Sequence, residues 1–186
     1  MSSAQSETIA VIGAGRTGRA LARRAALGGF EVVLEDLVPI SLEQARLEIR
    51  RELDEMVAAG ALESWQANLA YERIRYAATI EAAARQAHVV METGPDEYES
   101  KLEMFCLLDR ICLPGTVIIS NCRQLELSDT ATNAHAIVGM YFEGDEAELH
   151  CSAFTSEQAL EVARRLAGRM AKKFRITREG QASAQA

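Results

Sequence analysis

Three glycines near the N-terminus have the spacing of a loop that binds phosphate groups. Gly13, Gly15 and Gly18 follow the apolar run 8–12 and form the pattern G-x-G-x-x-G. In such a loop the first glycine permits a tight turn, the second lets the backbone approach a pyrophosphate, and the third allows close packing of helix on sheet. The pattern indicates binding of a dinucleotide by backbone N–H groups at the start of a helix.

An acidic residue, Asp36, lies where the adenosine ribose of a dinucleotide would be bound. It follows Gly18 by 18 residues, at the end of a second apolar run over residues 31–35. A carboxylate at this position accepts hydrogen bonds from the ribose hydroxyls and repels a 2′-phosphate. The sequence therefore predicts NAD(H) rather than NADP(H) as the cofactor. Within the loop, Arg16 either contacts a phosphate or is solvated, and Thr17 belongs to the predicted cofactor contacts.

The elements around these residues make the glycine pattern more specific. Residues 8–12 and 31–35 are predicted to be buried parallel strands, because each is a short run centred on apolar residues. The helical pattern between them ends at Gly28-Gly29. A strand, helix and strand with an acid at this distance predict a Rossmann-type unit. The alternative is a glycine-rich turn in another kind of α/β protein.

The rest of the chain predicts helices and strands in alternation. A charged helix with Ser41 as its N-cap runs to about residue 59 and forms, with a second helix over 61–72, a helical hairpin inserted in the unit. Residues 136–154 form a hairpin of two strands. We predict an α/β, Rossmann-type doubly wound, mainly parallel sheet with a helical hairpin insertion and a C-terminal mixed-strand region. The other predicted strands are 73–78, 87–92, 116–120 and 172–177, and the other predicted helices are 80–86, 97–111, 127–134 and 156–170.

Composition restricts the classes of partner and compartment. The 186 residues, 48% of them hydrophobic, suit a single domain over 1–178 with a disordered tail over 179–186. A net charge of −7 argues against nucleic acid or an anionic membrane as partner. No run is long enough to cross a bilayer and no signal peptide is recognised, so we expect a cytoplasmic protein. The four cysteines form no C-x-x-C pair, and the three histidines are too scattered to predict a metal site.

The order of the motifs resembles the N-terminal NAD-binding domain of the 3-hydroxyacyl-CoA dehydrogenases over residues 7–177. The matching stretches are IAVIGAGRTGRALA, GFEVVLED, METGPDEYESKLEMFCLLD, TVIISN and AIVGMYF. The resemblance implies NAD as cofactor, and it implies further contacts on the nicotinamide-ribose side. For Lys101, one of these residues, the alternative is a solvated surface lysine. The residues implied on that side are Glu92, Thr93, Gly94, Asp96, Lys101 and Asn121.

The residues that this family uses for catalysis are not matched. Tyr141 stands where the family has a general-base histidine in an H-F-F-N-P run, and Gly144 stands where the asparagine would be. Arg123 takes the place of the family's substrate-contacting serine after the fifth strand. A phenol with an ordinary pKa of about 10 is a poor base near neutrality. Glu148 and His150 are both candidates for the neighbourhood of the family glutamate that orients the histidine.

Three functions are therefore left open. The first is an oxidoreductase acting on a CH–OH group of a hydroxyacyl or small hydroxy-acid substrate, with Tyr141 and Arg123 as altered catalytic residues. The second is a non-catalytic NAD(H)-binding sensor, regulatory or partner subunit, and the third is a scaffold that no longer binds nucleotide. The family continues into a helical domain that this sequence does not match. We therefore expect apolar surface beside residues 136–177 and a homodimer formed through it.

Overall fold

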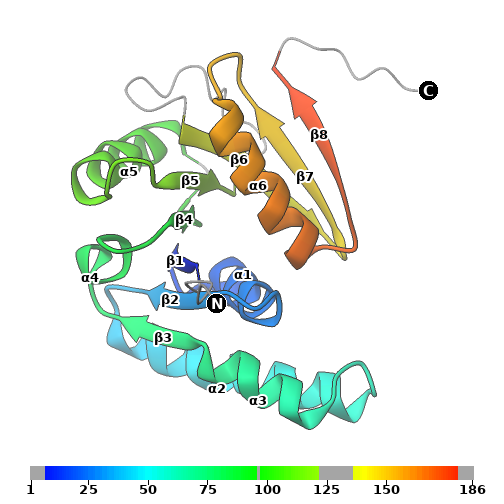
Figure 1. Ribbon diagram of the computed structural model, residues 1–186. Coiled ribbons are helices and arrows are strands. Elements are labelled where there is room, and N and C mark those ends of the chain that lie inside the picture. Colours follow the sequence, from blue (N-terminus) through cyan, green and yellow to red (C-terminus); the bar gives the residue numbers. More distant parts are fainter. Residues whose placement is uncertain (1–6, 96, 122–135, 180–186) are drawn as a thin grey trace, which may run out of the picture.

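The structure, a computed structural model, describes residues 7–95, 97–121 and 136–179 (Figure 1). Within them, an eight-stranded sheet has the order β3-β2-β1-β4-β5-β6-β7-β8. The strands are β1 (Thr8–Ile12), β2 (Glu31–Glu35), β3 (Ile74–Ala77), β4 (Val89–Glu92), β5 (Val117–Ser120), β6 (Ile137–Glu143), β7 (Glu146–Cys151) and β8 (Lys173–Arg178). The helices are α1 (Arg16–Leu27), α2 (Pro39–Ala58), α3 (Ser64–Glu72), α4 (Ile80–Ala84), α5 (Tyr98–Ile111) and α6 (Glu157–Met170).

The predicted doubly wound, mainly parallel sheet is confirmed. All neighbouring strands from β3 to β6 run parallel, β7 is antiparallel to β6, and β8 is parallel to β7. The change of direction occurs at the turn between β6 and β7, where Gly144 has a φ of 57°. The C-terminal mixed-strand region is therefore the β6–β7 hairpin with β8 added at its far edge.

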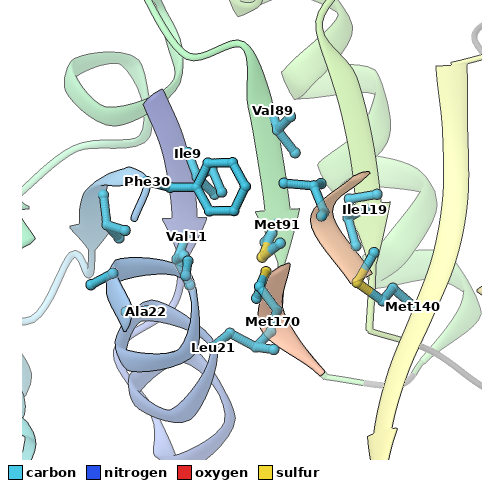
Figure 2. Close-up of a cluster of buried hydrophobic side chains, with 14 of the residues drawn as sticks. Ile9, Val11, Leu21, Ala22, Phe30, Val89, Met91, Ile119, Met140 and Met170 are labelled. Carbon is cyan, nitrogen blue, oxygen red and sulfur yellow. The ribbon is translucent and has the colours of Figure 1, made fainter. Parts of the chain in front are cut away.

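Two hydrophobic clusters, one on each face of the sheet, hold the helices in place. Alternate residues of β1 enter different clusters, with Ile9 and Val11 on the face of α1, α2, α3 and α6, and Ala10 and Ile12 on the face of α4 and α5. Both faces of β1 are thus buried, which explains its continuous apolar run. Figure 2 shows the first cluster, where strand residues lie beside Leu21 and Ala22 of α1.

Two helix starts differ from the prediction, and backbone chemistry explains both. The helix expected after Ser41 begins at Pro39, because proline fits the first helical position, where its missing N–H is not needed. The helix expected from residue 61 begins at Ser64, since Glu63 and Gln66 form a capping box. The predicted helix over 127–134 and residues 180–186 of the predicted tail lie outside the described residues.

The strand register aligns one residue of every strand in a single row across the sheet. The row follows the carboxyl ends of the parallel strands, where ligands of open α/β sheets bind. Directly paired residues face the same side, so the row lies with Ile12 on the face of α4 and α5. In strand order the row is Ala77, Glu35, Ile12, Glu92, Ser120, Gly139, His150 and Thr177.

Candidate functional site

Two glycines of the loop between β1 and α1 are required by the fold itself. Gly13 has a φ of 99°, a left-handed conformation that favours glycine, and its N–H donates to the Glu35 carbonyl at 2.9 Å. At Gly18 an added Cβ would lie 1.8 Å from the carbonyl oxygen of Gly13. The loop and the first turn of α1 therefore touch, and a side chain at Gly18 would separate them.

Gly15 is different, because nothing in the fold requires a glycine there. Its φ of −65° and ψ of −177° are accessible to any residue. A Cβ added to it would meet no described atom within 4 Å. The absent side chain leaves open space directly at the start of α1, which is the cradle that a closely approaching pyrophosphate needs.

The N-terminus of α1 is built to receive negative charge. No side chain caps the helix, and no acidic residue lies in its first turn. Arg16 and Thr17 are exposed in that turn, next to Gly15, which is exposed as well. The helix dipole and the uncapped N–H groups together favour an anion here. The predicted loop residues are thus brought together at one point.

Asp36 lies beside this loop and helps to fix it. Its Oδ2 accepts a hydrogen bond from the N–H of Ala14 and its Oδ1 accepts one from Val38, both at 2.9 Å. Arg19, which was not predicted, donates from Nη1 to the Ala14 carbonyl at 3.1 Å. The signal for Arg19 was a second arginine in the first turn of α1. The Ala14 peptide is therefore held from both sides, with the acid at the place predicted for the ribose.

The second predicted group of residues forms a buried polar cluster under the loop after β4. Lys101 Nζ lies 2.6 Å from Glu92 Oε2, and both side chains are 1% exposed. Lys101 also donates to the Gly94 carbonyl at 3.3 Å, and the Gly94 N–H donates to Glu92 Oε1 at 2.5 Å. Ser120 Oγ is 3.4 Å from the same carboxylate. The alternative of a solvated surface lysine at Lys101 is therefore wrong.

This cluster is joined to the glycine loop through neighbouring residues. Thr93 Oγ1 donates to the Ile12 carbonyl at 2.7 Å. A Cβ added at Gly13 would lie 2.9 Å from Thr93 Oγ1. The Asn121 N–H donates to the Glu92 carbonyl at 3.1 Å, which places Asn121 at the end of β5. Asp96 lies outside the described residues, so its predicted contact stays a prediction.

The proposed catalytic tyrosine lies further along the same face of the sheet. Tyr141 is two residues beyond Gly139 of the row and is paired directly with Glu148 on β7. Glu148 Oε2 forms an ion pair with Arg175 at 2.7 Å. His150, paired with Gly139, lies 3.1 Å from Thr177 through Nδ1. Glu148 and His150, the two candidates for the position of the family's orienting glutamate, thus lie on the same face of the sheet as Tyr141, and Glu148 is directly opposite Tyr141.

Comparison with known proteins places this geometry in a family. Residues 8–176 match the sequence profile described as 3-hydroxyacyl-CoA dehydrogenase, NAD binding domain. The chain belongs to this family. The match confirms the resemblance and supports NAD as the cofactor, because the matched profile is that of the NAD-binding domain.

Individual relatives agree with the family assignment. A Bacillus subtilis protein named "Probable 3-hydroxybutyryl-CoA dehydrogenase" is 33% identical over 137 residues, which are 72% of this chain and 47% of the relative. The 3-hydroxyadipyl-CoA dehydrogenase of Escherichia coli is 29% identical over 139 residues, or 73% of this chain and 29% of that protein. The chain therefore spans less than half the length of both relatives.

Solved structures show the same fold. The crystal structure of 3-hydroxybutyryl-CoA dehydrogenase from Escherichia coli superposes with a TM-score of 0.86 at 24% identity, covering 93% of this chain and 38% of the other. The solved structure thus shows the Rossmann-like architecture, while Tyr141 in place of the histidine that the resemblance implies stays a prediction. Arg123 lies outside the described residues, so its place beside Tyr141 stays a prediction.

Residues 7–95, 97–121 and 136–179 contain neither a metal-binding cluster nor a membrane-spanning helix. No group of three or more His, Cys, Asp or Glu side chains in this part of the chain is placed to hold a metal ion. None of its helices has both the length and the apolar sequence needed to span a membrane. Three of its cysteines, Cys106, Cys112 and Cys151, are free thiols.

Glu35 is a residue of the site that sequence reasoning missed. Its side chain is 2% exposed, and Oε1 has no hydrogen-bond partner among the described residues. The pKa of Glu35 is raised to about 7, chiefly by burial and then by the neighbouring charge of Asp36, while the Gly13 N–H acts to lower it. The available signal was a glutamate at the end of an otherwise apolar strand, immediately before the predicted ribose acid.

We expect Glu35→Gln to stabilise the folded protein increasingly as pH rises. The raised pKa means that the folded protein keeps a proton, between about 4.5 and 7, that the unfolded chain has already lost. Wild-type stability should therefore fall across this window and stay level above it, by about 3 kcal/mol in total. Urea unfolding at about pH 4 and about pH 8 measures the difference between variant and wild type on either side of this window.

The matched control for this prediction is Glu31→Gln. Glu31 lies on the same strand and by alternation on the same face, but at the end remote from the loop. The Glu31→Gln substitution removes one negative charge, as Glu35→Gln does, so both variants share the general effect of that charge loss on stability. If the Glu35→Gln and Glu31→Gln proteins follow the same pH dependence, the raised pKa of Glu35 is contradicted.

Proposed function

We propose that this chain binds NAD(H) and is the cofactor-binding part of an oxidoreductase that acts on a CH–OH group of a hydroxyacyl or small hydroxy-acid substrate. The observation that carries the proposal is the open space at Gly15. The fold requires no glycine there, yet a side chain would fill the space at the uncapped start of α1. A glycine that the fold does not need at this position is explained by a ligand group, such as a pyrophosphate, that closely approaches the protein backbone there.

The residues present fit the cofactor along its whole length. Backbone N–H groups at the start of α1 would hold the pyrophosphate, with Arg16 exposed beside them. Asp36 would take the adenosine ribose, and the loop after Glu92 with Asn121 would hold the nicotinamide ribose. When bound, the nicotinamide accepts or donates the hydride. The buried Glu92–Lys101 pair would keep the loop after β4 in position for it.

The acid after β2 favours NAD(H) over NADP(H). A 2′-phosphate on the adenosine ribose would lie close to the Asp36 carboxylate. Bringing like charges together at a partly buried site is unfavourable. This supports the proposed cofactor without reference to the substrate.

Calorimetric titration with NADH and NADPH tests the cofactor. We expect NADH to bind, NADPH to bind at least about 10-fold more weakly, and Asp36→Ala to weaken NADH binding by about 10- to 100-fold, the loss expected for hydrogen bonds to a charged group. Asp54→Ala, an exposed acid paired with Arg50 on α2, is the matched control and should bind as wild type. Equal affinity for the two cofactors would contradict the assignment.

A second function, a non-catalytic NAD(H)-binding sensor, regulatory or partner subunit, is favoured by one specific observation. Tyr141 and Gly144 stand where the family has its histidine and asparagine. NADH oxidation with a panel of 3-oxoacyl thioesters and small oxo acids separates the two functions. Turnover that Tyr141→Phe lowers while NADH affinity is unchanged supports the oxidoreductase, and NADH binding without turnover supports the sensor.

We also propose a homodimer in the cytoplasm. Phe174 on β8 is 40% exposed and Phe154, between β7 and α6, is 62% exposed, and a dimer contact would cover both; contiguous exposed apolar surface of this kind marks contact surfaces. Free thiols at Cys106, Cys112 and Cys151 suit a reducing compartment. Light scattering should give twice the mass of one chain, and a Phe154→Ser, Phe174→Ser variant should give one. A monomeric mass for the wild type would contradict the dimer.

A further inference from the structure

A buried acid at the cofactor loop has no role in the contacts proposed above. Glu35 ends β2, and its backbone carbonyl accepts the hydrogen bond from the Gly13 N–H that closes the loop. Its carboxyl group is buried, with Oε1 unpartnered among the described residues. A buried ionised carboxylate without a partner is costly, whereas the neutral acid is tolerated far better.

The charged groups around Glu35 add to this preference for the neutral acid. Asp36 on the same strand and Glu81 on α4 both carry negative charge toward it. In the sheet row Ile12 separates it from Glu92, whose charge is matched by Lys101.

Among residues 7–95, 97–121 and 136–179, no cation compensates the Glu35 carboxyl. On the side of α1, Arg19 donates to the Ala14 carbonyl, and Arg16 is exposed. On β3 the paired residue is Ala77. Within the part of the chain that the structure describes, Glu35 forms no ion pair.

We propose that Glu35 couples cofactor binding to protonation, so that the loop accepts NAD(H) with this side chain neutral and binding above neutral pH takes up a proton. The inference rests on the proposed function, because it concerns the same cofactor site. The pyrophosphate brings two negative charges to a loop whose Gly13 N–H donates to the Glu35 backbone carbonyl and also acts on the Glu35 carboxyl group, so that group lies next to the loop. An ionised Glu35 repels those charges, whereas a neutral one does not.

Thermodynamic linkage fixes the direction of the effect. If protonation of Glu35 favours NAD(H), then bound NAD(H) raises the pKa of Glu35 by the equivalent amount. The free protein has this pKa at about 7. Affinity for NAD(H) is therefore highest below that pH and falls above it, by about tenfold for each unit by which binding raises the pKa.

Calorimetric titration with NADH at about pH 6 and about pH 8.5, on either side of this pKa, tests the coupling. We expect the dissociation constant of the wild type to rise between the two by roughly three- to tenfold. Glu35→Gln, which cannot ionise, should show no rise, and Glu31→Gln should rise like the wild type. At about pH 7.5, between the pKa of the free and of the bound protein, the binding heat should vary with the ionisation enthalpy of the buffer in the wild type and not in Glu35→Gln.

The outcomes separate this inference from the proposed function. NADH binding that is independent of pH and of buffer in the wild type overturns the coupling and leaves the cofactor assignment standing. No binding at either pH overturns both. Since Glu35→Gln could perturb the loop, carboxyl carbon NMR of the wild type gives a second measurement. A Glu35 resonance that titrates near the ordinary glutamate value, with or without NADH, overturns the coupling.

Discussion

Gly15→Val should abolish NADH binding and leave the folded protein intact. The valine side chain would occupy the open space at the start of α1, where no described atom lies within 4 Å of an added Cβ. The backbone of Gly15 already has angles that valine adopts without strain. We expect at least about 100-fold weaker binding, roughly 3 kcal/mol, by calorimetry. The free energy of unfolding, measured with urea, should change by no more than about 1 kcal/mol, the scale of an N-cap substitution.

Gly18→Ala is the matched comparison. It should mainly lower the stability of the fold, whereas Gly15→Val should mainly weaken NADH binding. A Cβ added at Gly18 would lie 1.8 Å from the Gly13 carbonyl oxygen, so the loop and the helix must move apart. We expect a loss of stability of about 1–3 kcal/mol, as for other overpacked sites. If Gly15→Val binds NADH as the wild type does, the open space is not the pyrophosphate site and the proposed function loses its main support.

Lys101→Met should destabilise the protein by about 3–5 kcal/mol, the cost of breaking a buried ion pair from one side. Glu92 would keep its carboxylate at 1% exposure with its cation removed. The loop after β4 would also lose the hydrogen bond from Lys101 to the Gly94 carbonyl. Urea unfolding measures the loss, and NADH titration at a temperature where the variant is folded measures the effect on the cofactor site.

The double variant Glu92→Gln, Lys101→Met separates charge from packing. Removing both charges leaves no uncompensated carboxylate, so we expect it to recover a large part of the stability lost in Lys101→Met. As a control, Lys172→Met breaks the exposed pair with Asp145 and should cost no more than about 1 kcal/mol. A Lys101→Met protein as stable as the Lys172→Met protein would contradict the buried pair.

Local patterns allowed the cofactor half of the site to be predicted. The run 8–12, the glycine spacing and Asp36 lie within one strand–helix–strand unit. Its geometry depends on short-range properties, namely apolar periodicity and the conformational freedom of glycine. For the same reason the parallel strands were placed to within a few residues. The family resemblance added the residues after β4, which periodicity alone does not distinguish from any other loop.

Burial of charge could not be predicted in this way. Lys101 lies on an amphipathic helix, and the sequence does not show that its ammonium group forms a buried ion pair with the Glu92 carboxylate. For Glu35 too, the sequence does not show whether the side chain is buried under a helix or exposed to solvent. Its burial depends on the elements that pack on that face of the sheet, and those elements are distant in the chain.

By itself the sequence determined the Rossmann-type unit and the glycine loop, and it predicted Asp36 as the acid for the ribose, because each follows from residue type and spacing along the chain. Only the tertiary structure showed that the fold requires glycine at Gly13 and Gly18 but not at Gly15. It alone paired Tyr141 with Glu148 and set Glu35 beneath the loop. These properties depend on strand register and on contacts between distant segments, which a linear pattern does not specify.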